Sequence, residues 1–168
     1  MQTSVQSMAK LIDIEGIGKI YAVKLEALGL KTTAALLKRA SGLRGRRELA
    51  EAIQISEKRL LKWVNRADLM RVKGVGTQFS DLLEETGVDT VKELRNRVPE
   101  NLYAKMLEVN AARNLARRDP TLDEVRGWVA RARTLEVVVT HSAKGERQLA
   151  HQQQRKRQKL EGIKMLAL

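Results

Sequence analysis

Two short glycine-containing stretches carry the residues whose types and spacing could do chemistry. Residues 14–18 read IEGIG, and residues 72–76, lying 58 positions later, read VKGVG. Each precedes a stretch whose apolar residues recur at helical spacing. A tight turn at the start of a helix presents backbone N–H groups without helical acceptors at the positive end of the helix dipole, and this arrangement binds phosphate. We therefore regard these two segments, the first and second glycine turns, as candidate phosphate sites.

The two turns and their flanks resemble the helix-hairpin-helix motif over residues 11–30 and 69–88. The resemblance implies sequence-independent contact with the DNA backbone, in many members with a monovalent cation held by hairpin carbonyls. Apart from that cation, no cofactor is expected. Glu15 inside the first turn would repel phosphate unless it points away. The contact residues that the resemblance implies are Gly16, Ile17, Gly18 and Lys19 in the first turn, and Lys73, Gly74, Val75, Gly76 and Thr77 in the second.

A wider likeness extends over residues 11–140. The segments 13–18, 55–58 with 63–65, and 67–76 resemble a bacterial family of tandem helix-hairpin-helix proteins whose function is undetermined. This likeness implies the fold but no activity, and it leaves out the basic C-terminal residues.

The charge is strongly positive and uneven. The formal net charge is +12; residues 1–69 contribute +6, residues 70–140 contribute +1 and residues 141–168 contribute +5. Such a field favours a polyanionic partner. Two clusters could add phosphate contacts: Arg44, Arg46 and Arg47 at a loop-to-helix junction, and Arg155, Lys156 and Arg157 in the tail. Their alternatives are a solvated face for the first cluster and, for the tail, a helix that docks on an acidic protein with Leu160, Ile163 and Leu166 as anchors.

Residues 46–61 also resemble a helix-turn-helix, with Glu57, Lys58 and Arg59 near the start of the second helix. Gln54 replaces the usual glycine of that turn. The same two-helix pattern recurs in the second half without the basic residues, so we do not favour sequence-specific recognition.

Catalytic signatures are not readable in this chain. It has no cysteine and two histidines, and no HExxH, Walker or Ser-His-Asp pattern can be identified. We expect a protein that is not an enzyme, with no metal site and no small-molecule substrate. Without a membrane-length apolar run or a signal-peptide pattern, we also expect no membrane partner and a cytoplasmic location.

The elements that position the glycine turns follow from an internal duplication. Leu25, Gly29 and Thr32 match Leu83, Gly87 and Thr90 at the same offset of 58, and the Trp-bearing helices that end the two halves match at an offset of 65. Gly29 and Gly87 fit helix C-caps, and Thr90 and Thr121 fit capping boxes. Residues 41–45 are expected to form a loop, residues 136–140 an extended segment, and both Trp residues core anchors.

The sequence thus predicts an all-α fold of two tandem helix-hairpin-helix repeats, residues 1–69 and 70–140, followed by a basic, helical tail, residues 141–168. The favoured function is non-catalytic, sequence-independent nucleic-acid binding through the two glycine turns, with the basic tail and the Arg44–Arg47 region adding electrostatic affinity. DNA is placed ahead of RNA, although phosphate contacts alone do not separate them. The alternative is a protein-interaction scaffold or accessory subunit that docks through its basic tail.

Overall fold

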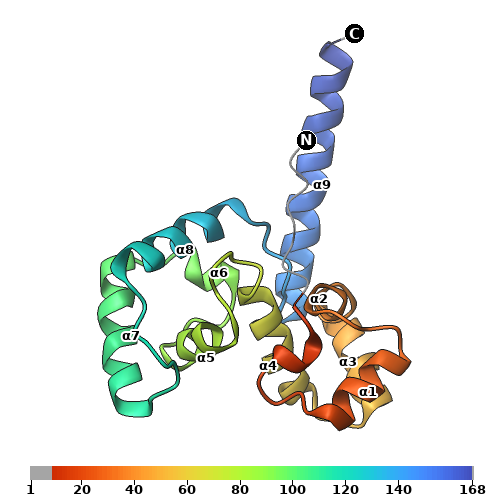
Figure 1. The fold of residues 1–168 in the computed structure, drawn as a ribbon. Helices are drawn as coiled ribbons and strands as arrows, with labels where there is room; N and C mark the ends of the chain where they lie inside the picture. The colour runs from red at the N-terminus through yellow and green to blue at the C-terminus, as the bar shows by residue number, and fades with distance from the viewer. Residues whose placement is uncertain (1–8, 168) are drawn as a thin grey trace.

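The computed structural model describes residues 9–167, which fold into helices joined by short loops (Figure 1). The predicted all-α class is confirmed for this range. The elements are η1 (Leu11–Asp13), α1 (Lys19–Ala27), α2 (Thr33–Ala40), α3 (Leu43–Ile53), α4 (Glu57–Leu69), α5 (Thr77–Glu85), α6 (Val91–Leu94), α7 (Pro99–Arg113), α8 (Leu122–Thr134) and α9 (Ala143–Leu166).

Local sequence signals set most helix ends. Gly29 and Gly87 follow α1 and α5 with φ of 81° and 89°, a backbone conformation that a side chain disfavours. The hydroxyls of Ser56 and Thr121 accept N–H groups in the first turns of α4 and α8. At α8 the predicted capping box is complete, because Glu124 accepts the N–H of Thr121.

The predicted capping box at Thr90 is wrong. The Thr90 side chain makes no capping hydrogen bond. The buried carboxylate of Asp68 on α4 accepts the N–H of Val91 at 2.8 Å instead, and Glu93 accepts the N–H of Asp89 at 3.0 Å. A residue 23 positions away therefore caps α6.

The loop predicted at residues 41–45 is shorter than expected, because α3 already begins at Leu43. Gly45 lies inside this helix, where an added Cβ would collide with the Arg39 carbonyl oxygen of α2. Close packing of α3 against α2, rather than a turn, therefore explains the glycine at position 45. At the other end of α3, Gln54 takes the left-handed conformation with φ of 60°.

Two hydrophobic clusters hold the helices together. The first gathers side chains from Leu11 to Met70 with Val139, and the second gathers side chains from Leu69 to Ala132. Trp63 lies in the first and Trp128 in the second, each 1% exposed, as expected for core anchors. The clusters meet at the end of α4. The division into residues 1–69, 70–140 and 141–168 stays a prediction.

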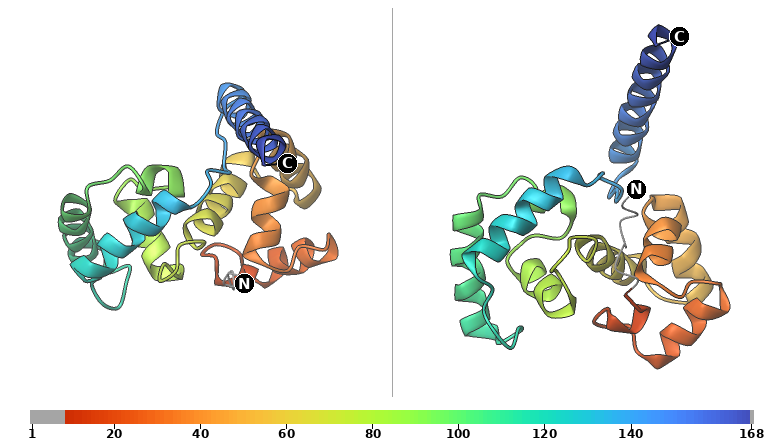
Figure 2. Two further views of the ribbon diagram at one scale, coloured as in Figure 1. Left: turned by 90° about the horizontal axis from the view of Figure 1, so that it is seen from above. Right: turned by 45° about the horizontal axis from the view of Figure 1, so that its top comes forward.

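Helix α9 projects from the body formed by the other helices (Figures 1 and 2). Residues 136–140 lead to it without regular secondary structure, and Val139 is buried in the first cluster. At its base, Glu146 accepts the N–H of Leu43 at the start of α3. In residues 9–167, no helix has the length and apolar character required to span a membrane.

Candidate nucleic-acid interface

The first glycine turn is held by two side chains of α4. Gly16 has φ of 91°, and a Cβ built there would lie 3.1 Å from Nε1 of Trp63. The Arg66 guanidinium donates from Nη1 to the Glu15 carbonyl oxygen at 2.6 Å. Ile17 is 3% exposed and points into the core. Trp63, Arg66 and the buried Ile17 therefore hold the turn in place, while Glu15, Gly16 and Gly18 remain on the surface.

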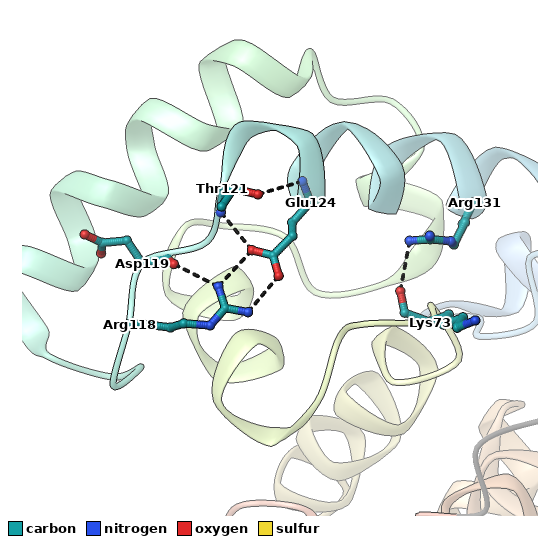
Figure 3. Close-up of polar contacts among 6 residues, drawn as sticks. All are labelled: Lys73, Arg118, Asp119, Thr121, Glu124 and Arg131. Carbon is teal, nitrogen blue, oxygen red and sulfur yellow. Dashed lines mark hydrogen bonds and ion pairs between the residues drawn. The ribbon is translucent and has the colours of Figure 1, made fainter.

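The second glycine turn has the same construction. Gly74 has φ of 95°, and its Cβ would lie 3.0 Å from Nε1 of Trp128. Arg131 on α8 donates to the Lys73 carbonyl oxygen at 3.1 Å (Figure 3). Val75 is 4% exposed. The Trp-Val-x-Arg pattern, shared by α4 and α8, thus forms the same support twice.

Both turns leave backbone donors at a helix start. The N–H of Ala22 donates to the Gly18 carbonyl oxygen at 3.0 Å, and the N–H of Ser80 donates to that of Gly76 at 2.9 Å. The N–H groups immediately before Ala22 and Ser80 therefore have no helical acceptor. Gly18 and Gly76 have no other atom within 4 Å of an added Cβ, apart from their chain neighbours, so a ligand could approach the backbone there.

A second aromatic ring packs against the Trp that contacts each turn, and a cation lies over that ring. Tyr21 packs edge-on against Trp63 with ring centroids 5.4 Å apart, and the Arg59 guanidinium lies 4.6 Å from the Tyr21 centroid. Arg59 is one of the two basic residues near the start of the second helix of the helix-turn-helix-like pattern, and here it contacts protein.

In the second half, Phe79 packs against Trp128 at 5.0 Å, and Arg118 lies 5.1 Å from the Phe79 centroid. The position equivalent to Arg59 is Glu124, which binds Arg118 at 2.7 Å (Figure 3). This hydrogen bond and that from the Thr121 backbone lower the pKa of Glu124 to about 2. The second half thus places a cation over its ring through a different residue.

Acidic groups surround the first turn. Arg66, besides holding Glu15, pairs with Asp81 at 2.9 Å and Glu84 at 3.0 Å on α5. Burial raises the pKa of Asp81 to about 6; Arg66 opposes this shift, and the nearby Glu15 and Glu84 add to it. Three carboxylates, those of Glu15, Asp81 and Glu84, therefore lie near the one Arg66 guanidinium. Phosphate would meet a weaker positive potential here than the net charge of residues 1–69 suggests.

The second turn has a more favourable electrostatic setting. Lys73 is exposed, and Arg131 lies beside it on α8 (Figure 3). The Thr77 hydroxyl donates to the Asp13 carbonyl oxygen at 2.6 Å, next to the first turn. Thr77 therefore offers a ligand its backbone N–H, while its hydroxyl hydrogen is already donated within the protein.

The cluster of Arg44, Arg46 and Arg47 is divided by the fold. Arg46 is 3% exposed and donates to the carbonyl oxygens of Ala40, Ser41 and Thr140. It is not available to a surface ligand, which corrects its prediction as a contact residue. Arg44 and Arg47 stay exposed, paired with Glu48 and Glu57.

The tail residues Arg155, Lys156 and Arg157 are exposed on α9. None of the three forms an ion pair with a carboxylate in residues 9–167. The fold separates them from the glycine turns, because α9 extends away from the body (Figure 2). The tail cluster is therefore a surface separate from the glycine turns.

Sequence reasoning missed the roles of Arg66 and Arg131. Both lie three residues after a Trp and hold the carbonyl of the exposed residue inside a glycine turn. The recurrence of Trp-Val-x-Arg-Ala at an offset of 65 was a signal that could have identified them.

Comparison with known proteins places the chain in a family. Residues 15–135 match the model of a family described as Domain of unknown function (DUF4332), and the chain belongs to it. No curated protein and no solved structure matches the chain.

Proposed function

We propose that the protein binds the sugar–phosphate backbone of nucleic acid without sequence specificity, with DNA as the favoured ligand, through its two glycine turns. The observation that carries this proposal is the repeated exposure of donor N–H groups at the starts of α1 and α5, beside open space at Gly18 and Gly76. The net charge of +12 supplies the long-range attraction that a polyanion requires.

The second turn is the stronger contact in this proposal. Lys73 can form a charge-assisted contact to phosphate, whereas Glu15 at the equivalent position repels it. The carboxylates of Asp81 and Glu84 weaken the first turn further. We expect the first turn to contribute through its backbone and Lys19 alone.

The test is fluorescence anisotropy of a labelled random-sequence duplex across a salt series. Gly76→Glu places a negative side chain in the open space where phosphate would lie, and the residue's φ of −99° accommodates any side chain without strain. We expect this variant to lose affinity at least about tenfold, because a like charge faces the phosphate.

Ala111→Glu on α7 is the matched control, since it makes the same charge change at an exposed position of another helix. It should lose much less affinity. Equal losses in the two variants, or no duplex binding by the intact protein, would reject the proposal.

A protein-docking role is the second candidate, and one observation favours it. Near the end of α9, Leu160, Ile163 and Leu166 are 57%, 55% and 90% exposed. Apolar side chains at this spacing can anchor a helix in a partner's groove. An interaction confined to this helix, in a protein that binds no nucleic acid, would favour the scaffold function.

A further inference from the structure

A groove separates the first half of α9 from the body of the molecule. Two hollows of about 570 Å³ and 170 Å³ form it. Arg95, Val137, Leu149 and Gln152 line both hollows, so they adjoin one another. Its walls are α6, the end of α8, the connecting residues 135–142 and the facing side of α9. We call it the α9 groove.

Cationic side chains from three elements line the α9 groove. Lys92 lies on α6 and Arg95 caps its end, Arg133 comes from α8, and Lys144 and Lys156 come from α9. Glu136 is the one acidic residue among the described lining residues. The groove is therefore strongly positive, although residues 70–140, which supply three of the cations, are nearly neutral as a whole.

These cations lack carboxylate partners. Across residues 9–167, none of the five forms an ion pair. Arg95 and Arg133 instead donate to one another's backbone carbonyl oxygens, at 3.3 Å and 3.2 Å. Other arginines of the same half, such as Arg118 and Arg126, are paired with glutamates. Like charges gathered without counter-charges disfavour folding, and a bound polyanion relieves this repulsion.

The remaining lining residues indicate which polyanion fits. Gln152 and Gln153 offer amide groups between the cations, and such side chains contact phosphate and sugar oxygens. The apolar lining residues are aliphatic, namely Leu135, Val137, Val139 and Leu149. The described lining includes no Phe, Tyr or Trp, so the groove lacks an aromatic anchor pocket for a peptide. We propose that the α9 groove binds the sugar–phosphate backbone of nucleic acid as a site separate from the glycine turns.

This inference rests on the proposed function because it takes nucleic acid as the ligand. The residues that form the groove are not those of the glycine turns. The glycine turns lie at the starts of α1 and α5, whereas the groove is formed by α6, α8 and α9. Variants of the two sites can therefore be scored independently.

The experiment measures duplex affinity and its salt dependence for the triple variant Lys92→Gln, Lys144→Gln, Lys156→Gln in the full chain. These lysines make no side-chain hydrogen bond or ion pair in the described residues, so the variant should fold. Arg95 and Arg133 are left intact because they bind the backbone. We expect an affinity loss of at least about tenfold and a salt slope shallower by about 2 to 3, since each lost phosphate contact removes about 0.9.

The control is Lys31→Gln, Lys38→Gln, Lys105→Gln, which removes the same charge away from the groove. Equal losses in the two triple variants overturn the inference, while sensitivity to Gly76→Glu would still uphold the glycine turns. A loss only in the groove variant, with Gly76→Glu unaffected, upholds the groove and rejects the turns. Groove-dependent binding of polyglutamate without binding of nucleic acid would assign the groove to an acidic protein and overturn the inference.

Discussion

Gly16 and Gly18 lie two positions apart but meet different surroundings. Gly16 has a positive φ and sits against the Trp63 indole, whereas Gly18 has φ of −80° and open space beside it. The same contrast separates Gly74 from Gly76. The first glycine of each turn thus serves the fold, and the second leaves room for a ligand.

Gly16→Ala should destabilise the protein by about 2 kcal/mol, because the φ of 91° is strained for alanine and the buried indole cannot withdraw. Gly18→Ala is the matched control and should change stability by less than about 1 kcal/mol. Urea unfolding followed by circular dichroism measures both. Similar losses for the two variants would contradict this division of roles.

Asp81 gives the first turn a pH-dependent neighbour. Its pKa in the folded protein, about 6, lies above the ordinary value of 3.8, so the fold prefers the protonated carboxyl. The stability associated with this group is complete at pH below 3.8 and is lost as the pH rises through about 6. The loss is at most about 3 kcal/mol.

Asp81→Asn should remove this part of the pH dependence, so that the variant gains stability relative to the parent between pH 4 and pH 7, two values bracketing the shift. The free energy of unfolding, measured across that range, provides the check. Asp123→Asn alters a side chain that is 94% exposed and should keep the parent profile. A parent-like profile for Asp81→Asn would show that the carboxyl titrates normally.

At the scale of elements, Arg46 joins three segments. Its guanidinium binds the end of α2 through Ala40 and Ser41, and the segment before α9 through Thr140. Glu146 strengthens the same junction by accepting the N–H of Leu43. Helix α9 itself has no buried residue, so these polar contacts and the buried Val139 of the preceding segment fix its base.

Arg46→Ala should cost about 3 kcal/mol of stability, because it leaves buried carbonyl oxygens without a donor. The neighbouring change Arg47→Ala removes only an exposed ion pair with Glu57, so it should lower stability by less than about 1 kcal/mol. Chemical denaturation of both variants makes the comparison. If the two changes were equally mild, α9 would need a different anchor.

Local signals predicted elements and caps well. The glycine C-caps and the capping box at Thr121 depend on neighbours within one or two helical turns, and the burial of both Trp residues follows from their place on the apolar face of a helix. The failures at Thr90 and Arg46 have a common cause: the deciding hydrogen bonds, from Val91 to Asp68 and from Arg46 to Thr140, span 23 and 94 positions. A sequence pattern cannot report a partner that only the tertiary fold supplies.

The candidate site also combines features that local sequence could predict with features that only the tertiary fold creates. The exposed glycines could be predicted from their spacing, because a tight turn before a helix is a local feature. The carboxylates around the first turn come from α5, and the α9 groove is assembled from three helices. Neither the weakening of one turn nor the gathering of cations at the groove was visible in the regional net charges.

At the scale of the whole molecule, the two halves contain similar supports with different surfaces. Each half holds a glycine turn on a Trp and an Arg, but the first turn faces acidic side chains and the second carries Lys73. The Thr77 contact to Asp13 links the second turn to the first half. We expect one nucleic acid to engage the second turn and the α9 groove more strongly than the first turn.

The central claim is that backbone N–H groups of the glycine turns bind phosphate. The most direct measurement is an NMR titration of the ¹⁵N-labelled protein with a short duplex, following each amide. We predict the largest shifts at Gly76, Thr77 and the N–H groups that follow them, with smaller shifts at Gly18 and Lys19. A saturating duplex that shifts amides of α9 alone, or none, would contradict the claim.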